Sequence, residues 1–126
     1  MKAIIIMLLA HLLCTASIAQ HNHKTQPADA TKNVWLDGGL GSVDHPVTTR
    51  NAEAQEFFNQ GLAYLYAFNH PEGIKSFRKA SELDPEMAMA YWGIALGLGS
   101  NYNVSADEAQ LTEAYANLQK ALDLAP

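Results

Sequence analysis

Histidine side chains are the groups in this chain best suited to bind a metal ion, since the single cysteine, Cys14, lies close to the N-terminus. His21 and His23 are separated by one residue in a polar stretch, an arrangement that can bind copper or nickel adventitiously. His45 and His70 have no metal-ligating partner at helical spacing on a shared predicted helix. We therefore predict no metal site and no cofactor, and keep these four histidines as the candidates for one.

A catalytic alternative stays open around two of these histidines. In it, His45 and His70 converge with Asn101 and Asn103, where the N-terminal segment meets the interhelical loops, to form a metal-binding or catalytic module. No nucleophile motif supports an enzyme, because Ser42 lacks the glycine pattern of a nucleophile elbow. The nearby glycines are not followed by the Gly-Lys-Ser/Thr of a phosphate loop. Enzymatic activity is therefore left open, and a non-enzymatic role is favoured.

The chain is acidic, with eight Lys and Arg residues against thirteen Asp and Glu residues and a formal net charge of −5. A surface of this sign repels the phosphates of nucleic acids and of anionic membranes. No basic stripe appears along the sequence. We therefore expect no nucleic-acid partner, and no membrane contact once the N-terminal segment described next has been cleaved.

The first 19 residues have the pattern of a secretory signal peptide. Lys2 gives a positive start, residues 3–13 are apolar apart from His11, and small residues precede Gln20. The apolar stretch is shorter than the roughly 20 residues of a membrane-spanning helix, although an uncleaved anchor is the alternative. Lipidation at Cys14 is disfavoured because no small residue stands directly before it. We predict cleavage after Ala19 and a secreted or periplasmic protein.

Two non-helical segments follow the predicted cleavage site. Residues 20–33 are polar and without apolar periodicity, which predicts a disordered leader. Residues 34–50 contain apolar side chains interrupted by glycines, which predicts an extended arm rather than a long helix. We expect Trp35 to pack on the helices, and a short hairpin turning at residues 37–39 is an alternative.

Apolar periodicity predicts four helices from residue 51 onward. The first is capped by Asn51 and runs to about residue 67, and the second follows a His70 cap and ends near residue 83. Asp84 is expected to cap the third helix, which reaches about residue 98. A capping box at Ser105 and Glu108 is expected to open the fourth, which carries an apolar series of Leu111, Tyr115, Leu118 and Leu122.

The helical region nearly repeats itself. A shift of 34 residues places Phe57 on Tyr91 and Gly61 on Ala95, and a shift of 41 places Phe77 on Leu118. Such periods predict stacked helix–turn–helix units, each of which buries its apolar face against its neighbour. Small residues would let the helices approach and rings would fill the space between them; the small ones are Gly61, Ala80, Ala95 and Ala121, and the rings are Phe57, Tyr64 and Phe77.

These residues resemble the tetratricopeptide repeat (TPR). Phe57, Gly61 and Tyr64 match its first helix, with Gln60 where leucine is usual, and Phe77 matches its second. The resemblance implies an all-α fold with two TPR-type pairs, residues 51–84 and 85–126, behind the arm and the signal peptide. Runs such as residues 68–70 and 83–85 also make the chain similar to the N-terminal part of long exported bacterial TPR proteins.

The resemblance implies a protein–protein interaction scaffold that forms the front end of a longer repeat array. Its concave groove would bind a polypeptide partner through apolar side chains, or would be filled by the arm or by further repeats of the same chain. The predicted groove residues are Phe58, Leu62, Leu65, Tyr66, Met89, Trp92 and Leu96.

Overall fold

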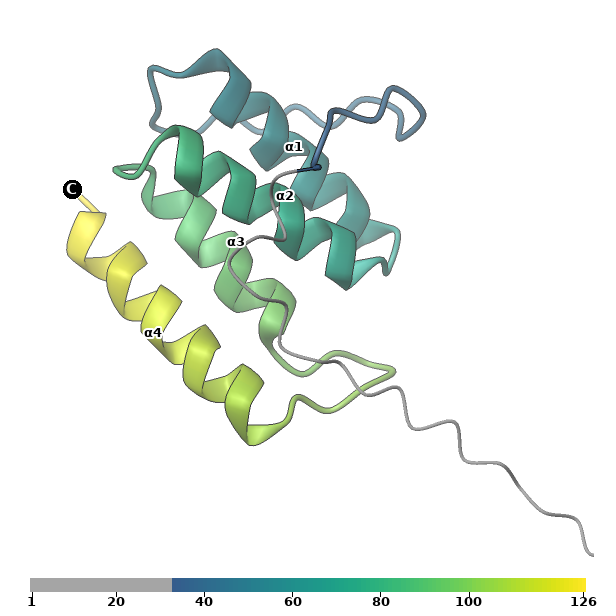
Figure 1. The fold of residues 1–126 in the computed structure, drawn as a ribbon, viewed down its shortest axis with the longest axis vertical. Coiled ribbons are helices and arrows are strands. Elements are labelled where there is room, and N and C mark those ends of the chain that lie inside the picture. Colours follow the sequence, from purple (N-terminus) through teal and green to yellow (C-terminus); the bar gives the residue numbers. More distant parts are fainter. Residues whose placement is uncertain (1–32) are drawn as a thin grey trace, which may run out of the picture.

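A computed structural model describes residues 33–126, which form four α-helices and no strand within that range. The helices are α1 (Ala52–Tyr66), α2 (His70–Leu83), α3 (Ala88–Leu98) and α4 (Glu108–Leu124). Successive helices run antiparallel and lie in chain order across the molecule (Figure 1). Each helix packs on the next one in the chain, and α1 also touches α3. The prediction of an all-α fold is confirmed for this part of the chain.

Several predictions fall outside residues 33–126. These are the signal peptide over residues 1–19, Cys14, the histidines His21 and His23, and the leader apart from Asn33. Among the described helices, none combines the length and the apolar character that crossing a bilayer requires.

The first helix begins where the sequence predicts, and the second begins one residue early. The Asn51 side chain accepts hydrogen bonds from the backbone N–H groups of Glu53 and Ala54, at 3.0 and 3.2 Å. His70 is the first residue of α2 rather than its cap, because the helical hydrogen bonds already start at Asn69, whose carbonyl accepts from the Gly73 N–H at 3.1 Å. Pro71 fits inside the first turn, where no backbone N–H is needed.

The predicted starts of α3 and α4 are wrong by a few residues. Asp84 ends α2, since its N–H donates to the Ala80 carbonyl at 2.9 Å. The Asp84 carbonyl accepts from the Met87 N–H at 3.1 Å, and α3 begins only after this turn. The capping box of α4 consists of Asp107 and Gln110 instead of Ser105 and Glu108. The residue after Ser105 donates its N–H to the Ser100 hydroxyl, and this bond keeps the segment outside the helix.

The turn between α1 and α2 is a strained helix end. The Phe68 N–H donates to the Leu65 carbonyl at 3.0 Å, and the Asn69 N–H donates to the Tyr64 carbonyl at 2.8 Å. This is a Schellman motif, in which the residue with positive φ is usually glycine. Here that residue is Phe68, with φ of 59°, the one non-glycine residue with positive φ in the described chain. Its ring is 67% exposed, so burial of the ring does little to offset the backbone strain.

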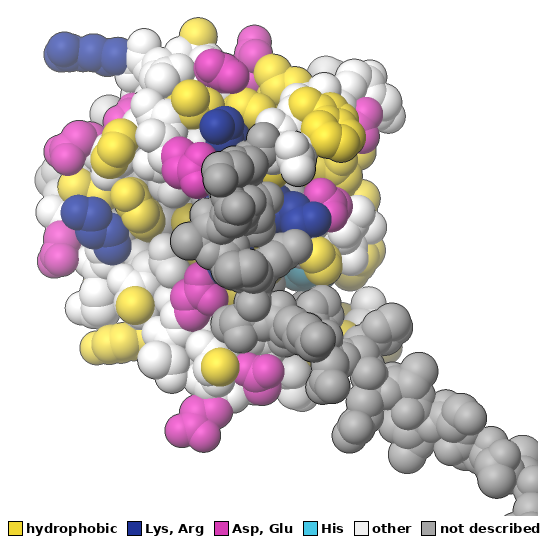
Figure 2. Space-filling model, viewed as in Figure 1, with side chains coloured by type: hydrophobic (Ala, Val, Ile, Leu, Met, Phe, Trp, Pro, Cys, Tyr) yellow, Lys and Arg dark blue, Asp and Glu magenta, His cyan; other side chains and the backbone are white. Residues whose placement is uncertain are grey.

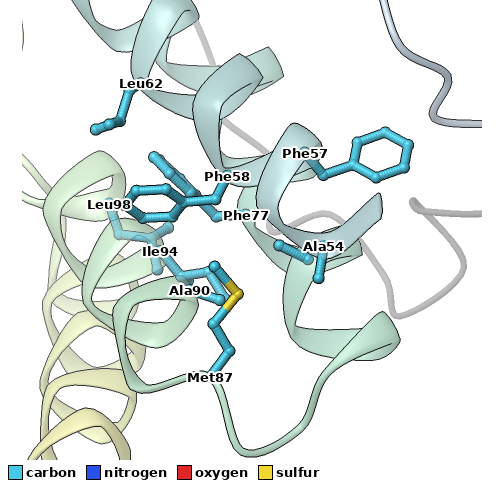
Figure 3. Close-up of a cluster of buried hydrophobic side chains, with 10 residues drawn as sticks. Ala54, Phe57, Phe58, Leu62, Phe77, Met87, Ala90, Ile94 and Leu98 are labelled. Carbon is cyan, nitrogen blue, oxygen red and sulfur yellow. The ribbon is translucent and has the colours of Figure 1, made fainter. Parts of the chain in front are cut away.

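The core is centred on Phe77 of α2, which is fully buried (Figure 3). A Cβ atom added at Gly61 of α1 or at Gly93 of α3 would lie 2.5 Å from the Phe77 ring. Gly97 of α3 meets Ile74 of α2 in the same way, at 2.6 Å. The predicted notch at Gly61 is therefore confirmed, whereas α3 receives the side chains of α2 at Gly93 and Gly97 rather than at the predicted Ala95.

Candidate binding surfaces

The extended arm runs beside α1 (Figure 1), and side-chain amides of α1 hold it through its backbone. The Val47 N–H donates to Gln55 Oε1 at 3.0 Å, and Gln55 Nε2 donates to the His45 carbonyl at 2.9 Å. One turn further along α1, Asn59 Oδ1 accepts from the His45 N–H at 3.1 Å. Because these contacts involve only the backbone of the arm, they fix an extended segment without selecting its side chains.

A buried glutamine fixes the start of the arm. Gln60 Oε1 accepts from the Asp37 N–H at 2.7 Å, and its Nε2 donates to the Trp35 carbonyl at 3.0 Å and to the Ser76 hydroxyl of α2 at 3.1 Å. The amide thus joins the arm, α1 and α2, which gives the buried glutamine a structural role. The sequence shows an unusual glutamine at position 60, but it cannot show the partners of Gln60, because two of the three are backbone groups.

Tyr64 strengthens the same junction. Its hydroxyl donates to Asp37 Oδ2 at 3.1 Å. Burial, the hydrogen bond with Asp37 and the negative charges of Asp37 and Glu72 all raise the pKa of Tyr64 above its usual value. The fold therefore favours the neutral phenol, because only that form donates this hydrogen bond.

The prediction that Trp35 packs on the helices is wrong, since its side chain is 72% exposed. The arm is attached near this residue by backbone groups, so the indole is not needed as an anchor. The arm side chains that pack against the core are Val34, Val43 and Val47. Residues 37–39 form a turn closed by Asp37, but no hairpin, because no strand pairs across it.

The seven predicted groove residues separate into three groups. Phe58 and Leu62 are buried in the core, and the His45 ring of the arm lies 6.0 Å from the Phe58 ring, centroid to centroid. Leu65 packs beside the positions of Gly73 and Gly97, between the helices. The other four residues form the third group, which reaches the surface. Met89 and Trp92 are half-buried against the core, and Tyr66 and Leu96 are exposed.

The groups of the catalytic alternative occupy different parts of the fold. His45 lies against the middle of α1, whereas His70 begins α2, beyond the C-terminal end of α1. Asn101 Oδ1 accepts from the N–H groups of Asn103 and Val104, at 2.9 and 3.0 Å, and so closes its own loop. Within residues 33–126 no three His, Cys, Asp or Glu side chains are placed to hold a metal ion together.

Within residues 33–126, four of the exposed large apolar side chains lie on the fourth helix. In α4 only Ala121 is buried, while a stripe spaced four, three and four residues apart is exposed. α4 packs on α3, and an ion pair between Arg78 of α2 and Glu113 crosses to one flank of α4. Figure 1 shows α4 at the outer edge of the described helices. We name this surface the α4 stripe; it consists of Leu111, Tyr115, Leu118 and Leu122.

Charge does not mark a separate site. Residues 33–126 contain five Lys and Arg residues and twelve Asp and Glu residues, and Figure 2 shows acidic side chains distributed among hydrophobic ones on the displayed face. Three of the five basic residues, Lys75, Arg78 and Lys79, form ion pairs with glutamates. A shallow open hollow, lined only by residues of α4 between Glu108 and Ala116, lies away from the α4 stripe. The acidic character predicted for the chain is therefore present at the described surface.

The described part of the chain thus presents an arm bound to α1, the exposed side chains of Tyr66 and Leu96, and the α4 stripe. Comparison with known proteins found no matching family model, no matching curated protein and no matching solved structure.

Proposed function

We propose that this chain is an exported scaffold of TPR-type helical pairs that binds another polypeptide, or further repeats of its own chain. The observation that carries this proposal is the α4 stripe. Leu111, Tyr115 and Leu122 are each more than half exposed, and Leu118 is 40% exposed, on one side of a helix that packs on α3. The ion pair between Arg78 and Glu113 links this helix to α2. Exposed apolar patches of this kind mark interaction surfaces in soluble proteins.

The arm supports the choice of the α4 stripe over the predicted groove. Gln55 and Asn59 already hold the arm across α1, and His45 covers Phe58. A polypeptide entering the groove would have to displace these contacts. The α4 stripe has no covering segment within residues 33–126, so a partner can bind there without any rearrangement.

The test compares three forms of the full chain as bait in the exported fraction of the cells that make it. These are the wild type, Leu118→Glu, which places a charge in the α4 stripe, and Ala116→Glu, a matched control on the exposed side of the same helix. Quantitative mass spectrometry should recover a polypeptide with the wild type and the control but not with Leu118→Glu. Equal recovery with all three forms, each folded by circular dichroism, would reject the α4 stripe as the binding surface.

A further inference from the structure

The packing of α3 on α2 shows which residues a helix needs in order to pack on an apolar helix face. Phe77 and Ile74 project from α2, one turn apart, and α3 receives them at Gly93 and Gly97. A Cβ atom at either glycine would come within 2.5 to 2.6 Å of the side chain that it meets, which is closer than carbon atoms approach in contact. Two small residues four positions apart therefore let α3 reach α2.

Two central residues of the α4 stripe, Tyr115 and Leu118, repeat the α2 positions that meet α3. Shifted by 41 residues, Ile74 corresponds to Tyr115 and Phe77 to Leu118. The small residue Ala80 corresponds to Ala121, and both are buried. The two positions differ in exposure: Phe77, which α1 and α3 both contact, is 0% exposed, whereas Leu118 is 40% exposed.

We propose that the α4 stripe binds an amphipathic α-helix of a partner polypeptide that carries glycine at two positions four residues apart. This inference rests on the proposed function and names the partner's chemistry. The bound helix runs antiparallel to α4, as α3 runs to α2, with its first small residue over Leu118 and its second over Tyr115. Bulky residues at these two positions would hold the helices apart and leave the apolar contacts open.

The contacts of α3 provide a probe for this proposal. An 18-residue peptide of alanine, lysine and glutamate is given the buried face of α3, with glycines at the positions of Gly93 and Gly97. The control peptide has leucine at both positions. It is more apolar and forms a helix more readily, so hydrophobic attraction alone would make it the tighter ligand. Binding to the full chain is followed by fluorescence anisotropy.

We expect the glycine peptide to bind at least tenfold more tightly than the leucine peptide. Leu118→Glu, and independently Leu122→Glu, should weaken its binding at least tenfold, while Ala116→Glu leaves it unchanged. Equal or tighter binding of the leucine peptide would overturn the proposal, and so would indifference to both substitutions in the α4 stripe. Two variants are used so that misfolding of one does not decide the result.

Two further outcomes separate this inference from the proposed function. If neither peptide binds but a partner recovered from the exported fraction still depends on Leu118, the requirement for small residues fails and the scaffold function stands. If sedimentation shows a dimer of the wild type that Leu118→Glu dissociates, a second copy covers the α4 stripe and the proposed partner helix is rejected.

Discussion

A single methyl group added at Gly61 should destabilise the fold, although alanine is the better helix former. In Gly61→Ala the new Cβ would lie 2.5, 2.6 and 2.8 Å from three carbons of the Phe77 ring. The ring has little room to move, because α3 approaches it equally closely at Gly93. Phe77 is fully buried, so no exposed rotamer relieves the overlap.

The expected magnitude is the difference between two opposing effects. Overpacking a dense core costs about 1 to 3 kcal/mol, and the close approach of both α1 and α3 to the ring places this site near the upper end. The higher helix propensity of alanine returns about 1 kcal/mol. We therefore expect the free energy of unfolding to fall by about 2 kcal/mol, which lowers the melting temperature of a domain of this size by about 10 °C.

Urea unfolding followed by circular dichroism measures this loss, with Gly99→Ala as the control. A Cβ at Gly99 would meet its nearest atoms at 3.5 Å, and the backbone φ there is −65°, so alanine fits without strain. The control should be unchanged or more stable by about 0.4 to 1 kcal/mol. In Gly61→Ala/Phe77→Leu the smaller side chain should recover about 1 kcal/mol as coupling in a double-mutant cycle. A Gly61→Ala protein as stable as the wild type would refute the tight ring contact.

Three other changes test the arm and the helix end. Gln60→Leu removes the hydrogen bonds to Asp37 and Trp35, so limited proteolysis should cut the arm several-fold faster while the helices resist; an unchanged cutting rate would show that other contacts hold the arm. Phe68→Gly relieves the positive φ at an exposed residue and should raise the free energy of unfolding by about 0.5 to 1 kcal/mol in urea; a loss would show that the ring contributes packing. The raised pKa of Tyr64 means that its neutral form stabilises the fold below about pH 10, the usual pKa, and that this contribution is lost as the pH rises through the folded-state pKa. Tyr64→Phe should therefore make unfolding less dependent on pH above about pH 10 by circular dichroism, and an unchanged dependence would place the titrating group elsewhere.

The sequence predicts the helices well because their signals are local. Four amphipathic or apolar segments separated by Asn, Pro and Gly become α1 to α4, and Asn51 caps α1 through its own side chain. The starts of α3 and α4 are less predictable, because two cap-like residues compete within a few positions. Asp84 can open one helix or close another, and Ser105 and Asp107 both begin a capping-box pattern. Hydrogen bonds formed only in the folded chain, to backbone carbonyls near Asp84 and to the Ser100 hydroxyl before α4, decide between them.

The candidate surfaces are less predictable because they depend on how the helices rotate against each other. Phe58 and Leu62 have the spacing of groove residues, yet the arm and the neighbouring helices bury them. The 34-residue offset indicates Ala95 as the notch of α3, whereas the Phe77 ring fixes a rotation in which Gly93 is used. The contacts of Gln55 and Gln60 with the arm could not be predicted for another reason. A side-chain amide that binds backbone groups requires no particular residue type at the partner position. The TPR resemblance stays a prediction.

The internal repeat allows the chemistry of a partner to be inferred from the exposed α4 stripe. Exposed leucines alone indicate only that something apolar binds, because the hydrophobic effect has no direction. The α2 residues that correspond to Tyr115 and Leu118 already contact α3, and the close contacts at Gly93 and Gly97 show that this packing requires small residues at helical spacing. Because Tyr115 and Leu118 repeat the positions of Ile74 and Phe77, a helix that packs on them needs small residues at the same spacing. The α4 stripe therefore selects its partner by how closely a helix can approach rather than by how apolar that helix is.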